Sequence, residues 1–485
     1  LISLAGLAKI LQRLHIYRIE KLLGCKPPRR LNQSKALFGL DFISEFVSAA
    51  RSHRVLEHIR NLHEKYDYTF AANVLGDTFF HTSEPENIKA LLSTQFADFS
   101  LGWKRHRDFS PLLGDGIFTV DGPAWKHSRD MLRPNFTKVQ LDGNLSTLEK
   151  HFQLLLTQTP PDGCPIDLQQ LFLKLTMDVS TEFLFGVSTN SLSIKENDSM
   201  DIFCQAFEDA QWGVSLRPRL GALNDYYTNP KFTKACAIVH GYVEDLIECA
   251  LAEKAVAQRN AKEGSQYCFL QKLSEVVPNQ RELRDHALSV LLAGRDTTAG
   301  LLSITFFVLA RRPDVWKRLQ HEVEELQGAL PTFEQLKDMT YLQYVLKEVL
   351  RLYPTTPLNN RHANKDTTLP VGGGADGRSK VLIRKDQRVT FAVYAMHRRK
   401  DLFGADAEEF RPERWQYLRP GWNYLPFNGG PRTCLGQQFA ITESSYVIVR
   451  LLQEFKNIEP RDPEPFTELL GLTLASKNGC LVSLT

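Results

Sequence analysis

One cysteine of this chain stands in a setting suited to metal chemistry. Cys434 lies in the run Phe-Asn-Gly-Gly-Pro-Arg-Thr-Cys-Leu-Gly over residues 427–436, before an apolar-patterned segment that predicts a helix beginning at Gly436. The charge of Arg432 and the helix dipole both favour a deprotonated sulfur, the form that binds metal. The glycines permit close backbone approach to a flat macrocycle, beside which the ring of Phe427 can pack. We therefore predict a metal-bound thiolate, with a buried structural cysteine as the alternative.

The spacing of this run is specific. The pattern Phe-x-x-Gly-x-Arg-x-Cys-x-Gly fixes five positions, so a chance match is on the order of one in a few million starting points. The run resembles the signature of the cytochrome P450 family of haem-thiolate monooxygenases. The resemblance implies haem b as cofactor, Cys434 as the iron ligand, and Phe427, Arg432 and Gly436 as residues at the haem.

Composition and charge narrow the class of protein. The chain has 485 residues, of which 43% are hydrophobic and 24% are charged, with a net charge of +3. The near balance of charge and the lack of a long basic arm argue against nucleic acid as a partner. Eight cysteines are scattered without zinc-finger spacing, which indicates reduced thiols in a cytosol-facing protein.

Hydrophobic periodicity predicts a mainly α protein with small β-sheets near both ends, an α+β fold. Helical periodicity dominates residues 123–353, and Pro123 fits a first helical turn. Capping boxes are predicted at Ser83, Thr332 and Thr340. Strands are predicted over residues 68–74, 78–82, 381–383, 389–395 and 472–484. The resemblance implies the cytochrome P450 fold, with a long oxygen-binding helix over a buried haem, in a single catalytic domain over residues 31–485.

The first thirty residues differ from the rest of the chain in composition. Residues 1–11 are mostly apolar and are followed by basic residues and by Pro27-Pro28. Because the chain starts at Leu1 rather than Met, a segment before it could be missing. One interpretation is an amphipathic first helix. The other, which we predict for residues 1–30, is the end of an N-terminal membrane anchor with a basic flank and a Pro-Pro hinge.

A second group of reactive residues lies within a helix predicted from about Glu282 to Arg311. The run Ala-Gly-Arg-Asp-Thr-Thr over residues 293–298 places an acid and two hydroxyls in mid-helix. Threonine hydroxyls there can bond to the carbonyl four residues back and bend the helix, and the charges exclude a membrane span. Taken alone, the run fits a tolerated kink with a solvated acid. The resemblance implies instead that Asp296 and Thr297 deliver protons to bound dioxygen.

Charged residues on another helix resemble the structural triad of the family. Glu348 and Arg351 are three apart, so both charges lie on one helix face. They precede the run Phe-Arg-Pro-Glu-Arg-Trp over residues 410–415. The resemblance implies that Glu348, Arg351 and Arg414 form a buried charge triad, in which loss of one partner costs about 3–5 kcal/mol.

Trp125 and Arg129 are four residues apart and therefore share a helix face. The alternative interpretation is an exposed amphipathic face with one aromatic anchor. The indole N–H and the guanidinium are pure donors, whereas haem propionates are acceptors. The resemblance implies that Trp125 and Arg129 bind the propionates, together with Arg432 and Arg361.

Several longer stretches, over residues 111–118, 125–134, 394–400 and 404–415, resemble a fungal branch of the family that hydroxylates n-alkanes and fatty acids, often at the terminal carbon. Residues 96–118 are rich in Phe and Leu. The basic residues 104–107 either meet a carboxylate at the pocket mouth or form a solvated loop. We expect contacts with substrate from Phe96, Phe99, Phe109, Ile117, Phe118, Ala293 and Leu358.

The predicted activity is insertion of one oxygen atom of O2 into an apolar C–H bond of a long-chain fatty acid or n-alkane, at or near its end. The chain carries no flavin or nicotinamide domain, so electrons from NADPH must arrive through NADPH–cytochrome P450 reductase, with cytochrome b5 as a further partner. The resemblance implies attachment to the endoplasmic reticulum membrane, with the catalytic domain on the cytosolic face. The alternatives are a tailoring oxygenase of fungal secondary metabolism or xenobiotics, and a peroxide-driven isomerase or an inactive haem scaffold. The Asp296–Thr297 pair argues against the last two.

Overall fold

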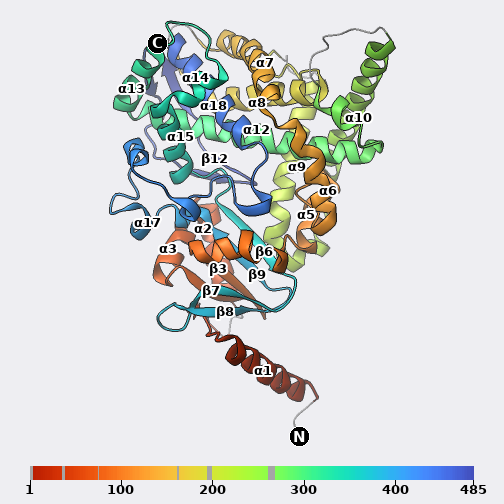
Figure 1. The fold of residues 1–485 in the computed structure, drawn as a ribbon, viewed down its shortest axis with the longest axis vertical. Helices are drawn as coiled ribbons and strands as arrows, with labels where there is room; N and C mark the ends of the chain where they lie inside the picture. The colour runs from red at the N-terminus through yellow and green to blue at the C-terminus, as the bar shows by residue number, and fades with distance from the viewer. Residues whose placement is uncertain (1–3, 35–38, 75, 161–162, 194–198, 260–267) are drawn as a thin grey trace. The chain divides into compact units, whose positions relative to one another are not determined.

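The structure is a computed structural model that describes residues 4–34, 39–74, 76–160, 163–193, 199–259 and 268–485 (Figure 1). Residues 1–3 of the predicted anchor lie outside this set. The chain divides into two compact units. Unit 1 comprises Leu1–Gly102, Pro357–Glu409 and Pro420–Thr433, and unit 2 comprises Trp103–Thr356, Phe410–Arg419 and Cys434–Thr485. Within the described residues, no helix combines the length and apolarity needed to cross a bilayer.

Unit 1 contains a mixed six-stranded sheet with the strand order β1-β2-β3-β9-β6-β4 and a separate β7–β8 hairpin. The antiparallel β2–β3 hairpin lies where alternating residues predict it. Apolar side chains of the sheet and of the following helical turns, among them Phe80, Leu91 and Phe391, form one core. The strands are β1 (Arg29–Arg30), β2 (Thr69–Val74), β3 (Asp77–Thr82), β4 (Phe99–Ser100), β6 (Leu358–Ala363), β7 (Thr367–Gly373), β8 (Ser379–Ile383) and β9 (Arg388–Ala392).

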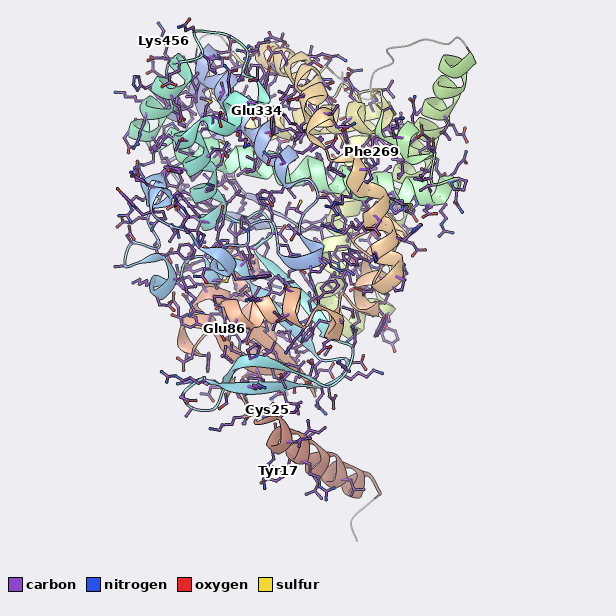
Figure 2. The ribbon with its side chains drawn as sticks, viewed as in Figure 1. Tyr17, Cys25, Glu86, Phe269, Glu334 and Lys456 are labelled. Atoms are coloured by element: carbon purple, nitrogen blue, oxygen red, sulfur yellow. The ribbon has the colours of Figure 1, made fainter. Side chains whose placement is uncertain are left out.

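Unit 1 also contains helices and short helical turns. They are α1 (Leu4–Leu23), α2 (Leu40–Arg51), α3 (Val55–Lys65), α4 (Pro85–Lys89), η2 (Ala90–Thr94), η3 (Phe96–Asp98), α16 (Val393–Met396), α17 (Lys400–Phe403), η7 (Gly421–Asn423) and η8 (Gly430–Arg432). The residues after α1 pair at once with the β-structure: Cys25, labelled in Figure 2, forms a bridge with Lys380, and Pro28 forms one with Gly373. The Pro-Pro stretch that we predict as a hinge is thus part of the β-structure of unit 1.

Unit 2 is predominantly helical, as the periodicity of residues 123–353 predicts. Its longest helix, α12, spans 31 residues and packs against α8, α10 and α18 (Figure 1). The helices are α5 (Trp103–Leu113), α6 (Gly122–Leu132), η4 (Arg133–Asn135), α7 (Lys138–Thr157), α8 (Leu168–Phe185), α9 (Ser199–Leu220), η5 (Gly221–Tyr226), α10 (Pro230–Arg259), α11 (Phe269–Leu273), α12 (Gln280–Ala310), α13 (Pro313–Glu324), α14 (Phe333–Asp338), α15 (Thr340–Leu352), η6 (Pro412–Gln416) and α18 (Gln437–Glu454). The predicted helix boundaries of α12 and α18 hold within two residues.

The core of unit 2 is formed where α8, α9, α10, α11 and α12 meet, with Phe207, Phe269 and Leu288 fully buried. Figure 2 labels Phe269, whose ring packs against Phe136 and Phe183. Short strands complete the unit: β5 (Ile166–Asp167), β10 (Ile458–Pro460) and β13 (Leu481–Leu484) form one sheet, and β11 (Glu468–Leu470) and β12 (Leu474–Ser476) form a hairpin.

The predicted capping boxes had different outcomes. The box at Thr332 is confirmed. Gln335 donates its backbone N–H to the Thr332 hydroxyl, and the side-chain oxygen of Gln335 accepts a hydrogen bond from the backbone N–H of Thr332. The box at Ser83 is wrong, because the buried Ser83 hydroxyl bonds to the His63 ring and α4 begins at Pro85. The box at Thr340 is also wrong, because the Gln343 amide bonds to the Leu336 carbonyl instead. The predicted strand over residues 389–395 ends at residue 392, and α16 begins at residue 393. The single strand predicted over residues 472–484 is two strands, over residues 474–476 and 481–484, separated by a turn.

Candidate active site

Cys434 lies directly before the N-terminus of α18, in unit 2. Its side chain is accessible to water, yet burial among protein atoms raises the pKa of the thiol. Both observations hold if the sulfur lines a confined, water-accessible space. The backbone N–H of Gly436 and the guanidinium of Arg129 act in the opposite direction on this pKa. Burial and these two groups therefore act in opposite directions on the sulfur, and a cation bound there would favour its deprotonated form.

Helix α6 carries both residues predicted to meet the propionates. Trp125 is buried, and Arg129 is half-buried. Loss of water lowers the pKa of Arg129, and the nearby Cys434 raises it. This closeness of Arg129 to the cysteine is a relation that the sequence spacing does not reveal, since the two residues are 305 positions apart. Helix α6 thus brings the Arg129 cation close to the sulfur, with Trp125 one turn earlier on the same helix.

Helix α12 holds Asp296 and Thr297 near its middle. The Thr297 hydroxyl donates to the carbonyl oxygen of Ala293 at 2.6 Å, which is the backbone bond that the sequence predicts. The hydroxyl oxygen keeps its lone pairs and remains able to accept a further hydrogen bond. Burial raises the pKa of Asp296, and the adjacent Arg295 only partly offsets this effect. Asp296 is therefore an acid that retains its proton more readily than an exposed aspartate.

Arg295 and Glu208 contact the Asp296 region but are absent from the predicted site residues. Arg295 bonds to Asp296 at 3.0 Å and to Glu208 of α9 at 2.6 Å, so one guanidinium joins two carboxylates. All three line a cavity of about 360 Å3 between α8, α9, α12 and the β11–β12 hairpin. The Glu208 side chain is 47% exposed, whereas Asp296 is 13% exposed. An arginine next to an acid in mid-helix is the only signal that the sequence offers for this network.

The structure brings the three charges of the predicted triad together within unit 2. Arg351 donates to both carboxylate oxygens of Glu348, at 2.9 and 2.8 Å, and Arg414 donates at 2.8 Å. The indole of Trp415 and the backbone N–H of Arg411 donate to the same carboxylate, each at 3.0 Å. All three charged side chains are buried. The cluster joins α15 to η6, the segment that contains the second arginine of the triad.

The remaining predicted haem residues belong to unit 1. Arg361 is buried on β6 and donates to the Asn360 carbonyl at 2.8 Å. Phe427 and Arg432 are half-buried in the segment that precedes Cys434. Gly430 in this segment has a φ of +67°, and a Cβ there would lie 1.8 Å from the carbonyl oxygen of Leu92. Only glycine fits both constraints.

The predicted substrate residues are also divided between the units. Phe99 is buried in the core of unit 1, and Phe96 is half-buried on η3. Leu358 begins β6. In unit 2, Phe109 belongs to the helical core, against which Ile117 and Phe118 pack as partly buried residues. The carbonyl of Ala293 accepts the bond from Thr297 described above.

Comparison with known proteins identifies the family. The sequence model of the family described as "Cytochrome P450" matches residues 38–482, so the match extends over both units. Cytochrome P450 monooxygenase himC of Aspergillus japonicus is 45% identical over 95% of this chain and 84% of its own, and cytochrome P450 monooxygenase fsdH of Fusarium heterosporum is 44% identical over 96% and 83%. Cytochrome P450 52A13 of Debaryomyces hansenii is 42% identical over 92% and 90%.

The chain belongs to the cytochrome P450 family. It is a monooxygenase that uses haem b, an apolar substrate, and electrons that pass from NADPH through a reductase. The residues of unit 2 fit such a cofactor in donor chemistry: Cys434 offers a water-accessible sulfur, and α6 carries an indole and a guanidinium, which are suited to carboxylates.

Proposed function

We propose that Cys434 is the thiolate ligand of the haem iron and that the enzyme hydroxylates long-chain fatty acids or n-alkanes at or near the chain end. The observation that carries the assignment is the setting of Cys434: a water-accessible sulfur that faces the Gly436 N–H and Arg129. Of the eight cysteines, Cys434 alone lies in a glycine-rich loop before a helix.

The chain's own residues then have distinct tasks. A haem with a thiolate ligand supplies activation of dioxygen. Trp125 and Arg129 hold propionates, with Arg361 and Arg432 as further donors, and Phe427 packs beside the macrocycle. Asp296 holds a proton more readily than an exposed aspartate because burial raises its pKa, and Arg295 orients the carboxyl group. Thr297 accepts a hydrogen bond from a water molecule, because the Ala293 carbonyl engages its own hydroxyl hydrogen and fixes the position of the oxygen.

Replacing Cys434 tests the ligand assignment. Cys434→Ser should bind haem without the thiolate-type Soret band of the reduced carbon monoxide complex, while Cys480→Ser, a buried control, should keep the band. A thiolate-type band in Cys434→Ser would refute the assignment.

The proposed substrate class is supported by the fungal resemblance and by the apolar side chains of residues 96–118. Phe109, Ile117 and Phe118 lie together at the core of unit 2. A pocket lined by such side chains stabilises a chain by about 0.8 kcal/mol per methylene, or roughly fourfold in affinity for each added carbon. Spin-state titrations with fatty acids and alkanes of increasing length should show this rise. Turnover of a compact aromatic metabolite without any response to chains would favour a tailoring oxygenase instead.

We also propose attachment to the endoplasmic reticulum membrane, with the catalytic domain in the cytosol and cytochrome b5 as a second electron donor. Apolar side chains are exposed on α1 at Leu11 and Leu14. On α2, Leu40, Ile43 and Val47 are exposed at spacings of three and four, which places them on one face. Co-sedimentation with phospholipid vesicles should fall when Ile43 and Val47 are both replaced by Ser. Equal sedimentation of the variant and the wild type would exclude this face as a contact.

A further inference from the structure

Asp285, in the second turn of α12, is a buried carboxylate that the proposed function does not use. Its Oδ2 accepts the backbone N–H of Asp115 at 2.9 Å, although the two residues are 170 positions apart. Its Oδ1 accepts from the Nε and from a terminal amino group of Arg284, at 3.1 and 2.9 Å. Arg284 also donates to Glu244 of α10 at 2.6 Å. One oxygen of Asp285 is thus held by an arginine of its own helix, and the other oxygen holds a distant loop.

That loop comprises residues 114–119, between α5 and α6. It lies against α12 at two glycines. Gly114 has a φ of +52°, and a Cβ there would lie 1.9 Å from the Oδ2 of Asp285. A Cβ at Gly116 would lie 2.2 Å from the hydroxyl oxygen of Ser289. The lack of side chains at these two positions therefore lets the backbone of the loop reach the surface of the helix.

The loop is also closed on itself by a buried hydroxyl. The Thr119 hydroxyl lies 2.7 Å from the carbonyl oxygen of Gly114 and 2.9 Å from that of Gly116, so its one hydrogen is shared between them. The backbone N–H of Thr119 donates to the Gly116 carbonyl at 3.0 Å. The loop is therefore tied to Asp285 at its start and to itself at its end, and residues 117–118 lie between these ties.

The side chains between the ties are Ile117 and Phe118. Both are partly buried and pack against the helical core of unit 2, so each keeps a part of its surface for other contacts. An apolar chain offers few polar groups for recognition, so the apolar side chains around it decide where it lies. A shift of these two side chains would move the chain relative to the oxidising group, and such small displacements have large effects on reactivity.

We propose that Asp285 is a positioning residue: it fixes Ile117 and Phe118 through the loop and thereby determines which carbon of the substrate is oxidised. The inference rests on the proposed function, because these two side chains are among those expected to contact the substrate. It assigns a part in selectivity to a carboxylate that touches neither the substrate nor the cofactor.

Asp285→Asn tests the tie. An amide has only one oxygen, and the guanidinium of Arg284 is the stronger donor, so the oxygen should turn toward it. The NH2 group then faces the backbone N–H of Asp115, and the loop loses its hydrogen bond. Glu182→Gln is the matched control, since it makes the same chemical change at another buried carboxylate of unit 2, which bonds to the His151 ring at 2.7 Å.

Two quantities are measured on each holoenzyme. Amide hydrogen exchange of residues 114–120, followed by mass spectrometry, shows whether the loop is held. The ratio of terminal to subterminal hydroxylation of dodecanoic acid, with NADPH and the reductase, shows where oxidation occurs. In Asp285→Asn we expect exchange to become about tenfold faster and the product ratio to change by about tenfold. Glu182→Gln should keep both values of the wild type, even if its stability falls.

An unchanged rate of exchange in Asp285→Asn would overturn the proposal, because the carboxylate would then not hold the loop. Faster exchange with an unchanged product ratio would overturn it too, since the role would be structural only. If wild-type enzyme oxidises no chain, the proposed substrate class fails. The ratio of 1-naphthol to 2-naphthol formed from naphthalene then replaces the ratio of terminal to subterminal products, and the same outcomes apply.

A second variant covers the case in which Asp285→Asn does not fold. Gly116→Ala leaves the carboxylate in place, but its Cβ would meet the Ser289 hydroxyl and must displace the loop from α12. The product ratio should change in this variant as well. A wild-type ratio in Gly116→Ala would overturn the proposal, because a displaced loop would then have no effect on the site of oxidation.

Discussion

Glu348 and Asp296 are both carboxylates that lie against arginines in unit 2, but their surroundings differ. Glu348 accepts bonds from two arginine side chains, an indole and a backbone N–H, and it is fully buried. Asp296 shares a single arginine with Glu208 and borders a cavity. A carboxylate whose oxygens accept a full set of hydrogen bonds holds chain segments together. A carboxylate with few hydrogen-bond donors, beside a cavity, can exchange a proton. The same residue types thus hold segments together in one place and, in the proposed function, take part in proton transfer in the other.

The largest effect of a substitution is expected on stability, at Glu348. Glu348→Gln leaves Arg351 and Arg414 buried without a counter-charge, so the free energy of unfolding should fall by about 3–5 kcal/mol. Denaturant unfolding and haem content measure the change. Glu413→Gln is the control, since Glu413 is 44% exposed in its pair with Arg318 and should cost no more than about 1 kcal/mol. Equal stability of the two variants would remove the distinction between the networks.

On the chemical side, Thr297→Ala should leave the fold and haem intact but lower the ratio of product to NADPH consumed by about tenfold, with more peroxide released, because proton delivery loses its hydroxyl. Thr305→Ala is a matched control, since the Thr305 hydroxyl makes the same bond to the carbonyl four residues back, at 2.7 Å, but is fully buried. If both variants stay coupled, the Thr297 hydroxyl has no role in proton delivery.

Asp296→Asn should change how stability depends on pH. Because the pKa of Asp296 is raised in the folded protein, the folded state binds more protons than the unfolded state between the ordinary and the raised value. The free energy of unfolding of the wild type therefore falls as pH rises through that window, by about 1.4 kcal/mol for each unit by which the pKa is raised. Asp296→Asn should lack this fall in a comparison of unfolding curves from acid to neutral pH. An identical fall in both proteins would assign it to other groups.

The smallest effect is expected from Glu208→Gln. Its side chain is half-exposed, so stability at neutral pH should change by less than about 1 kcal/mol. The negative charge of Glu208 helps to raise the pKa of Asp296, so the variant should lower that pKa. Infrared titration of the Asp296 carboxyl band, assigned by its loss in Asp296→Asn, measures this shift. An unchanged midpoint would show that Glu208 and Asp296 are not coupled through Arg295.

Much of the fold is readable from the sequence because long amphipathic or apolar segments specify their own helices. Helix α12 is one example, since its start and end are predicted within two residues. Local side-chain bonds are less predictable: Ser83 and Thr332 have the same capping pattern, but only Thr332 is free to cap, since Ser83 is buried beside His63. Burial, which depends on the whole fold, decides between the two outcomes.

The sequence likewise identifies the residue types of the candidate site, but it does not identify the residues that contact them. The motif around Asp296 is visible in the sequence, whereas its link to Glu208 depends on α9 packing near α12, 87 positions away. The spacing of Trp125 and Arg129 indicates a shared face, but the closeness of Arg129 to Cys434 arises only in three dimensions.

The pairing of the residues after α1 with the β-structure of unit 1 has a practical consequence for shortened versions of the protein. Lys26 donates its backbone N–H to Lys380, β1 pairs with β2, and Leu31 donates to Ala71. Truncation at residue 31, to remove the apolar first helix, would remove β1 from the sheet and expose the hydrogen-bonding edge of β2. Exposed strand edges recruit other chains, so such a protein should aggregate. Truncation before Cys25 keeps the edge covered.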